Sequence, residues 1–369
     1  MKIVLAGGGT AGHINPALAI ANYAKKQDKN TEIIYIGAKG GMEEKLVEKA
    51  GYEFIGIKVT GFSRKVSLQG FSKNMSTIKN FLEACAKVRK ILREFKPDVC
   101  IGTGGYVSGP VVWQASRLNI KTLIHEQNAY PGITTKWLSK KVTAVMLASR
   151  DSKKYFNEDK CNLVITGNPI RGEILNSKKE DARKKLNLDK RPVILSFGGS
   201  LGARRINESI LDLMENVAKN DRYQMIHAYG KFGKWFIPTL EKRGVKLDSH
   251  KNLDVREYIF NMAECLAAAD LVICRSGAIS LSEIEALGKA SILIPSPNVA
   301  ENHQYHNAME LVKNNASEIL QEKDLTGESL IKKVENLIEN REKLKELEKN
   351  AKKMAIMNAN ERIYDLIKN

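Results

Sequence analysis

Short apolar runs alternate with longer amphipathic segments along the first half of this chain. The apolar runs have the length of buried β-strands and lie at residues 2–6, 32–36, 99–102, 122–125, 144–148 and 162–166. Apolar positions recur at helical spacing in residues 16–26, 42–50, 73–94 and 110–118. Because strands that alternate with helices form parallel sheets with helices on both faces, the first half predicts an α/β domain.

The second half repeats this alternation. Strands are predicted at residues 193–197, 223–228, 253–256, 271–274 and 291–294, and helices at 203–219, 261–268, 280–287 and 302–313. A break is expected at Gly167-Asn168-Pro169, since a residue before proline is disfavoured in a helix. We therefore expect an N-terminal domain over residues 1–166, a second domain over 167–350, and a helix in 351–369 that packs back on the first domain.

A glycine-rich loop follows the first predicted strand of each half. The loops are Gly7-Gly8-Gly9-Thr10-Ala11-Gly12-His13 and Gly198-Gly199-Ser200-Leu201-Gly202-Ala203. A strand that runs through glycines into a helix leaves backbone N–H groups exposed at a helix N-terminus, where anions bind. Two such loops predict two nucleotide-type domains with a substrate cleft between them.

Composition and charge narrow the class of protein. At 369 residues the chain exceeds the usual size of a single core, and 43% hydrophobic residues are typical of a globular protein. Residues 1–165 hold 26 Lys and Arg against 13 Asp and Glu, so the net charge of +17 is concentrated in the first half. This charge favours nucleic acid, an anionic membrane or an anionic substrate as a partner, without choosing among them.

The first glycine loop also fits the dinucleotide fingerprint, Gly7-x-Gly9-x-x-Gly12, which makes an NAD-dependent oxidoreductase one alternative. That fingerprint requires an acidic residue at the end of the second strand, where this chain has Ala38-Lys39.

A metal site is not expected, because His303-x-x-His306 has no third ligand at suitable spacing and no Asp-x-Asp pair is present. The five scattered cysteines are expected to be buried thiols.

Polar residues follow several predicted strands at the edge where parallel sheets bind ligands. His13 begins a helix after the first loop and is a candidate general base, with a packing or capping role as the alternative. Tyr106 ends a third glycine loop, and Glu126 lies in His125-Glu126-Gln127-Asn128; both are candidates for substrate contact.

In the second half, a helix start follows the strand at 271–274. The N–H groups of Gly277 and Ala278 are placed to hold a diphosphate, and Glu283 to accept hydrogen bonds from a ribose diol. The alternative for Glu283 is an exposed helix carboxylate.

The segment 71–96 combines apolar and basic residues in a pattern that suits a helix lying on a membrane surface. The candidate contact residues are Phe71, Lys73, Met75, Ile78, Lys79, Phe81 and Leu82. The alternative is an amphipathic helix that packs on the core, but the charge of this half favours the membrane.

Together these motifs resemble those of the MurG family, the bacterial UDP-N-acetylglucosamine–N-acetylmuramyl-(pentapeptide) pyrophosphoryl-undecaprenol N-acetylglucosaminyltransferases. The segments that carry the resemblance are GGGTAGHINPALAIA, GTGGYVSGP, HEQNAYPG, TGNPIR, SFGGSLGARRIN, ICRSGAISLSEI and PSPNVAENHQYHNA. They span nearly the whole chain in the order of the family. One departure is Ala11, where many members have glycine, and its small side chain still permits close approach of a substrate.

The resemblance implies an α/β protein of the GT-B type, with two Rossmann-like parallel-sheet domains facing across a cleft. It implies inverting, metal-independent transfer of N-acetylglucosamine (GlcNAc) from UDP-GlcNAc to the 4-hydroxyl of a lipid-linked muramyl pentapeptide in peptidoglycan synthesis. The partners would be these two substrates and the cytoplasmic face of an anionic membrane, where the protein would be peripheral. No cofactor and no nucleic acid are expected.

The resemblance also assigns roles by position. Donor binding falls to Thr10, Ala11, Gly12, Asn128, Arg171, Ser200, Ile259, Glu283 and Gln304. Among them Arg171 and Ser200 meet the phosphates, the backbone of Ile259 meets the uracil, and Gln304 meets the GlcNAc hydroxyls. His13 matches the proposed catalytic histidine, and Tyr106 and Glu126 match positions near the acceptor, with Glu126 a second catalytic candidate.

The alternatives from other classes stay open at this point. They are another UDP-sugar GT-B transferase, a UDP-GlcNAc epimerase, the NAD-dependent oxidoreductase, and a non-enzymatic basic protein that binds nucleic acid or membrane. An assay with UDP-GlcNAc in the presence and absence of the lipid-linked acceptor separates the first two from the family's reaction.

Overall fold

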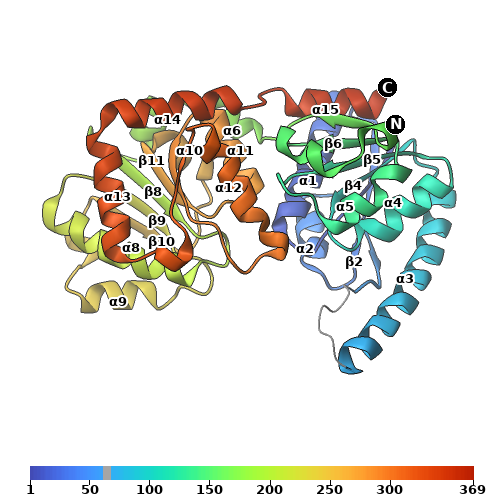
Figure 1. The fold of residues 1–369 in the computed structure, drawn as a ribbon, viewed down its shortest axis with the longest axis horizontal. Coiled ribbons are helices and arrows are strands. Elements are labelled where there is room, and N and C mark those ends of the chain that lie inside the picture. Colours follow the sequence, from blue (N-terminus) through green and yellow to red (C-terminus); the bar gives the residue numbers. More distant parts are fainter. Residues whose placement is uncertain (61–67) are drawn as a thin grey trace. The chain divides into compact units, whose positions relative to one another are not determined.

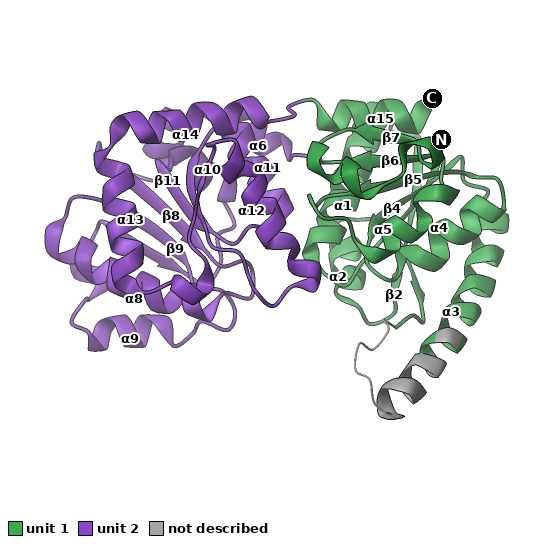
Figure 2. Ribbon diagram, in the orientation of Figure 1, with its two compact units in different colours: residues 1–169, 358–369 green, residues 170–357 purple. Residues whose placement is uncertain are grey.

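The computed structural model describes the backbone of residues 1–60 and 68–369, and the side chains of these residues except 68–76 and 78. Figure 1 shows the helices and strands, and Figure 2 shows that the chain divides into two compact units. The first unit comprises residues 1–169 and 358–369, and the second comprises residues 170–357. Each unit is a parallel α/β sheet covered by helices.

The first unit contains a seven-stranded sheet of order β3-β2-β1-β4-β5-β6-β7, in which every recorded pairing is parallel. Its strands are β1 (Lys2–Gly7), β2 (Glu32–Ala38), β3 (Glu53–Ile57), β4 (Val99–Gly104), β5 (Lys121–Glu126), β6 (Ala144–Leu147) and β7 (Leu163–Ile165). Its α-helices are α1 (Ala11–Gln27), α2 (Met42–Lys49), α3 (Leu68–Phe95), α4 (Ser108–Arg117), α5 (Ile133–Leu138) and α15 (Ala359–Lys368).

Alternating side chains of β1 build two cores on opposite faces of this sheet. Ile3 and Leu5 belong to the core beneath α1 and α15, whereas Val4 and Ala6 belong to the core beneath α3 and α4. Because successive side chains of a strand point to opposite faces, a continuous apolar run is buried on both sides.

The second unit contains a six-stranded parallel sheet of order β10-β9-β8-β11-β12-β13. Its strands are β8 (Val193–Phe197), β9 (Gln224–Ala228), β10 (Leu253–Arg256), β11 (Leu271–Cys274), β12 (Ala290–Leu293) and β13 (Glu318–Ile319). Its α-helices are α6 (Gly172–Asn176), α7 (Lys179–Lys185), α8 (Arg204–Asn220), α9 (Phe236–Lys242), α10 (Met262–Ala268), α11 (Ala278–Leu287), α12 (His303–Lys313), α13 (Gly327–Glu339) and α14 (Arg341–Met354).

These sheets confirm the predicted fold class of two Rossmann-like parallel-sheet domains. The cleft expected between the domains stays a prediction. The unit boundaries differ from the expected ones by a few residues. The chain passes from the first unit to the second after Pro169 and returns to the first unit at Asn358. Ala351, which we expected in the returning helix, is buried in the core of the second unit, and α15 packs on α1.

Several elements differ from those that the sequence predicts. Helix α1 begins at Ala11 rather than at residue 16, because the N–H groups of His13 and Ile14 already bond to the carbonyl oxygen of Thr10. Strand β3 was not predicted, since this edge strand is only partly buried and contains Gly56. Among the described residues no helix is long and apolar enough to cross a membrane.

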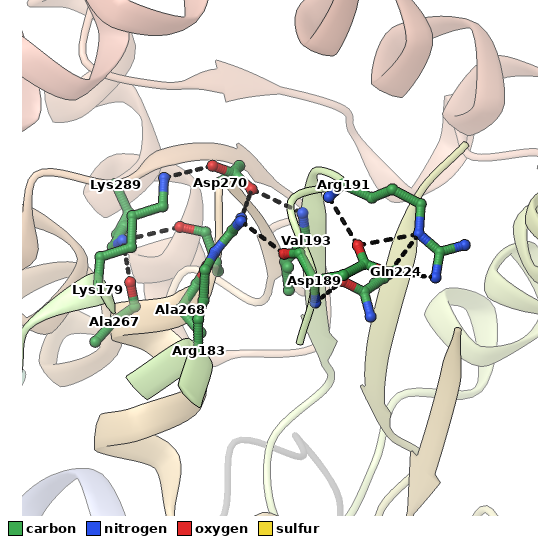
Figure 3. Close-up of polar contacts among 11 residues, drawn as sticks. Lys179, Arg183, Asp189, Arg191, Val193, Gln224, Ala267, Ala268, Asp270 and Lys289 are labelled. Carbon is green, nitrogen blue, oxygen red and sulfur yellow. Dashed lines mark hydrogen bonds and ion pairs between the residues drawn. The ribbon is translucent and has the colours of Figure 1, made fainter. Parts of the chain in front are cut away.

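A polar cluster joins α7 to the amino ends of β8 and β11 in the second unit (Figure 3). Asp270, just before β11, accepts hydrogen bonds from Lys179 and Arg183 of α7 and from the N–H of Val193. Lys289, just before β12, donates to the carbonyl oxygens of Ala267 and Ala269. The cluster lies at the edge of the sheet opposite to the glycine loop.

Candidate functional site

Close packing against side chains and against a second loop explains the glycines of the first loop. A Cβ atom on Gly7 would lie 2.1 Å from the Thr103 hydroxyl oxygen, and one on Gly8 would lie 2.1 Å from a carboxylate oxygen of Glu43. A Cβ atom on Gly105, whose φ is +78°, would lie 2.3 Å from the carbonyl oxygen of Gly8. The loop after β4 is therefore stacked directly on the loop after β1.

These contacts use N–H groups that we expected to bind an anion. The N–H of Gly8 donates to the carbonyl oxygen of Gly104 at 3.3 Å, and that of Gly9 donates to the Glu43 carboxylate at 3.3 Å. Glu43 is 1% exposed and also accepts from the N–H of Ala38 at 2.9 Å. The expectation that this loop offers free amide groups is thus wrong for Gly8 and Gly9, because a buried carboxylate and a carbonyl already bind them.

His13 lies in the first turn of α1, half-buried against Gly104. A Cβ atom on Gly104 would lie 2.6 Å from Nδ1 of His13, so only glycine leaves room for the ring. Nδ1 is 3.2 Å from Oε1 of Gln127, and the Thr103 hydroxyl donates to the His13 carbonyl oxygen at 2.7 Å. Both the ring and the backbone of His13 are therefore fixed at the carboxyl edge of the sheet.

Glu126, at the end of β5, is 3% exposed, and its carboxylate holds the loop that follows. One oxygen accepts from the backbone and side-chain N–H groups of Asn128, both at 3.1 Å, and the other accepts from the N–H of Gly132 at 2.9 Å. Tyr106 is 42% exposed, and partial burial, with a smaller contribution from the Glu43 charge, raises the pKa of its hydroxyl. The structure thus brings His13, Tyr106, Glu126 and Asn128 to one edge of the first sheet.

The second glycine loop is held through its carbonyl oxygens. The carbonyl oxygens of Ser200 and Leu201 accept from the N–H groups of Lys231 and Phe232, both at 3.1 Å. In the described part of the chain, the N–H groups of Gly199 and Ser200 donate to no protein acceptor. This loop keeps exposed amide groups just before α8, whereas in the first loop the N–H groups of Gly8 and Gly9 are bound and only those of residues 10–12 have no acceptor in the described part of the chain.

Arg171 and Glu283, which are 112 residues apart in sequence, form an ion pair in the second unit. Nε and an Nη atom of Arg171 lie 2.9 and 2.8 Å from the same oxygen of Glu283. Glu283 is 5% exposed, so burial raises the pKa of its carboxyl, and the Arg171 charge opposes that rise. Half of the Arg171 side chain stays exposed, so its guanidinium remains accessible to an anion.

The other donor-site candidates also follow the carboxyl ends of strands in the second sheet. Gly277 and Ala278 start α11 after β11, and Gln304 of α12 accepts from the N–H of Ser296 at 2.9 Å. The side chain of Ile259, after β10, is buried in the core. In parallel sheets this edge is where ligands bind.

The proposed membrane segment is described only in part. The side chains of Phe71, Lys73, Met75 and Ile78 lie outside the described residues. Phe81 stacks on Trp113 with ring centroids 5.7 Å apart and meets the edge of Trp137 at 6.3 Å. Leu82 is 59% exposed, and Lys79 is also exposed. Ile133 of α5, which is 64% exposed, and Trp137 at 43% add apolar surface that the sequence did not indicate.

Two further residues of the first unit were missed by sequence reasoning, Glu43 and Gln127. Gln127 lies within the polar segment His125-Glu126-Gln127-Asn128 that the sequence indicated. Its contact partners Thr103 and His13 belong to other elements, so the sequence did not show its role. Glu43 resembles any acidic residue in the first turn of a helix. Among the described residues no group of three or more His, Cys, Asp or Glu side chains is arranged to hold a metal ion.

Models of two known domains match this chain. Residues 3–147 match the glycosyltransferase family 28 N-terminal domain, and residues 193–363 match the glycosyltransferase family 28 C-terminal domain. A relative from Acetivibrio thermocellus is 47% identical, with 100% of this chain and 98% of the relative covered. A relative from Thermoanaerobacter pseudethanolicus is 45% identical, with 100% and 99% covered. Both are named UDP-N-acetylglucosamine--N-acetylmuramyl-(pentapeptide) pyrophosphoryl-undecaprenol N-acetylglucosamine transferase.

Solved structures agree with these matches. The crystal structure of Acinetobacter baumannii MurG superposes with a TM-score of 0.78 at 27% identity, covering 100% of this chain and 99% of that one. A UDP-GlcNAc 2-epimerase from Neisseria meningitidis, bound to UDP-GlcNAc, superposes with a TM-score of 0.64 at 16% identity over the whole of both chains. At this low identity the epimerase shows a shared fold and nothing about the reaction of this chain.

Proposed function

The chain belongs to glycosyltransferase family 28, and on that premise we propose that it transfers GlcNAc from UDP-GlcNAc to undecaprenyl-pyrophosphoryl-MurNAc-pentapeptide. The end-to-end match to relatives that are named for this reaction carries the proposal. The free amide groups of the second loop and the exposed guanidinium of Arg171, both in the second unit, support a division of labour. The second unit, whose loop keeps free amide groups, takes the anionic donor, and the first unit takes the acceptor.

The donor diphosphate binds at the start of α8 and α11 in this proposal. The free N–H groups of Gly199 and Ser200, the helix start at Gly277 and Ala278, and the Arg171 guanidinium together neutralise the phosphates. The Glu283 carboxylate accepts hydrogen bonds from the ribose hydroxyls. Because the N–H groups are dipolar and the Arg171 guanidinium is positive, they also stabilise the negative charge that grows on UDP as it departs.

The remaining donor contacts follow from the family's motifs. The backbone of Ile259 holds the uracil, and Gln304 and Asn128 hold the GlcNAc hydroxyls. Residues 10–12, at the start of α1, approach the sugar and the diphosphate from the first unit. In this assignment the buried Glu126 acts through Asn128, whose side chain and backbone it holds.

The reaction is a displacement at the anomeric carbon of GlcNAc. The 4-hydroxyl oxygen of the muramyl sugar forms a bond to that carbon while the bond to the UDP phosphate oxygen breaks, which inverts the centre. His13 takes the proton of the hydroxyl as general base, and Tyr106 contacts the acceptor sugar. No metal ion is assigned to any step.

Radiolabelled transfer tests the proposal. The full-length protein is incubated with UDP-GlcNAc labelled in the sugar and the lipid-linked acceptor, with and without EDTA. We expect label in the lipid product in both samples. Epimerised UDP-sugar without lipid product would instead assign the chain to another reaction, and loss of transfer in EDTA would refute metal independence.

A His13→Ala variant tests the base. Losing a general base lowers kcat by about 10²–10⁴-fold, whereas UDP affinity should change little, because no UDP contact is assigned to the His13 side chain. His250→Ala is the matched control, since His250 precedes β10 at the opposite edge of the second sheet. Unchanged kcat in His13→Ala would remove His13 from the mechanism.

The exposed apolar side chains of Leu82, Ile133 and Trp137 are proposed to contact an anionic membrane at its cytoplasmic face. A pocket on α3 and α4 is lined by four basic residues, Arg89, Lys90, Arg93 and Arg117, and by one acidic residue, Glu94, so its net positive charge suits lipid phosphates. Apolar insertion and basic attraction together give reversible peripheral binding.

Vesicle sedimentation tests this contact. We expect a Leu82→Glu, Ile133→Glu double variant to bind anionic vesicles more weakly than the wild type. Met357→Glu, at an exposed methionine of the second unit, is the control and should bind normally. Equal binding of the double variant and the control would refute the assignment.

A further inference from the structure

Gln127 connects His13 to two backbone carbonyl groups and to the ring of His125 through one buried amide. The Gln127 side chain is 4% exposed and follows β5. Its Nε2 lies 2.8 Å from the carbonyl oxygen of Thr103, 3.0 Å from that of His125 and 3.0 Å from Nδ1 of His125. Its Oε1 lies 3.2 Å from Nδ1 of His13.

The carbonyl groups fix the orientation of this amide. A carbonyl oxygen only accepts hydrogen bonds, so the Gln127 atom that faces Thr103 and His125 must be the NH₂ group. The reversed amide would place its oxygen against two carbonyl oxygens in a buried site, at the cost of unsatisfied polar groups. Oε1 therefore faces His13.

The orientation of Gln127 in turn determines where the His13 proton lies. Because Oε1 only accepts, Nδ1 of His13 must donate and therefore carries the proton. A neutral imidazole has one ring proton, so Nε2 of His13 keeps its lone pair. In the described part of the chain Nε2 has no hydrogen-bond partner.

The contacts of His125 independently support the same orientation of the Gln127 amide. Its Nε2 lies 2.9 Å from the carbonyl oxygen of Gly167, so Nε2 donates and Nδ1 accepts from Gln127. His125 is fully buried, and burial lowers the pKa of its ring, which keeps it neutral. The direction of donation is thus the same along the whole chain of contacts.

We propose that Gln127 is a positioning residue that holds His13 in the tautomer with the proton on Nδ1 and directs the Nε2 lone pair to the acceptor hydroxyl. The inference rests on the proposed role of His13 as general base. When the 4-hydroxyl proton moves to Nε2, the imidazolium keeps its Nδ1–H bond to Oε1, and no other proton has to move. Hydrogen-bond partners that orient metal-binding histidines contribute about 10- to 100-fold to activity, and we expect an effect of this order for Gln127.

Nitrogen-15 NMR of the histidine side chains tests the tautomer without an activity assay. Protonated and bare ring nitrogens of a neutral histidine differ widely in chemical shift, and the His13 signals are those lost in His13→Ala. In the wild type at a pH where the ring is neutral, we expect the proton on Nδ1. A proton on Nε2 would overturn the inference whatever the variants do.

Gln127→Met tests the cause, since it replaces the amide by an apolar side chain of similar size. We expect a change in the His13 tautomer signals and a fall in kcat of about 10- to 100-fold, with UDP affinity unchanged. Gln114→Met is the matched control, because Gln114 is also a buried glutamine of the first unit, at 7% exposure, on α4. A Gln127→Met variant with unchanged tautomer and unchanged kcat would refute the proposal.

The outcomes separate this inference from the proposed function. If His13→Ala retains full kcat, His13 is not the base, although the NMR result still decides its tautomer. If the proton lies on Nε2 while transfer to the lipid acceptor is observed, the function stands and the role of Gln127 falls. If Gln127→Met does not fold, the wild-type tautomer decides the proposal.

Discussion

Replacing Lys289 should change how the stability of the second unit depends on pH. Lys289 is 6% exposed, and Nζ donates to the carbonyl oxygens of Ala267 and Ala269 at 2.6 and 2.8 Å. Burial, followed by the nearby charge of Lys179, lowers the pKa of Lys289 from 10.5 to about 8, while the Asp270 carboxylate opposes that shift. Figure 3 shows this surrounding cluster.

The sign follows from proton binding. Between pH 8 and pH 10.5 the unfolded chain binds more protons at this lysine than the folded chain, so the free energy of unfolding rises with pH. The stability gained as Lys289 becomes neutral in both states is complete above pH 10.5, and it is lost as the pH falls through 8. At 1.36 kcal/mol per pKa unit the full change is about 3 kcal/mol, of which about 2 kcal/mol falls between pH 7 and pH 9.5.

Other groups oppose this trend, which makes a comparison of variants necessary. In the second unit, burial raises the pKa of Cys274 to about 12 and that of Cys265 to about 11. These thiols ionise first in the unfolded chain, so they reduce stability as pH rises above their ordinary value of 9. The difference between wild type and Lys289→Met cancels their contribution.

Urea unfolding at pH 7.0 to 9.5 measures that difference. Trp235 lies in the second unit, so its fluorescence reports on that unit when Trp113 and Trp137 are replaced by phenylalanine. We expect the wild type to gain about 2 kcal/mol relative to Lys289→Met over this pH range. Lys219→Met, at an exposed lysine of α8, should run parallel to the wild type. If Lys289→Met also runs parallel, the lysine titrates normally and the reasoning is wrong.

Two further predictions concern the glycine loops. Gly202→Ala should lower the free energy of unfolding by more than about 1 kcal/mol, because φ is +83° and the new Cβ would lie 2.2 Å from a carbonyl oxygen; Gly244→Ala, at φ +86° in open space, should cost less in the same urea titration. Glu43→Gln keeps one acceptor but turns an NH₂ group toward the N–H of Gly9 or of Ala38, so we expect lower kcat at unchanged UDP affinity and a stability loss of about 1–3 kcal/mol. Unchanged kcat would show that the carboxylate does not position the first loop.

Local patterns in the sequence were sufficient for the strands other than β3 and β13 and for the edge at which the candidate site lies. Strands β1 and β8 are buried on both faces, so their continuous apolar runs were recognisable without any partner strand. The glycine loops, His13 and Glu126 follow such strands directly, and parallel pairing brings strand ends to one edge. Strand β3 was missed because an edge strand is half-buried and leaves a weaker pattern.

The state of each polar group was decided only by the tertiary structure. The two glycine loops look alike in sequence, yet Glu43 and Gly104 bind the N–H groups of Gly9 and Gly8 in the first loop. In the sequence Gln127 is one of four consecutive polar residues, and only the structure shows that it contacts Thr103 and His13. Hydrogen-bond direction and desolvation depend on atoms that are distant in sequence, whereas strand and turn formation depend on neighbours along the chain.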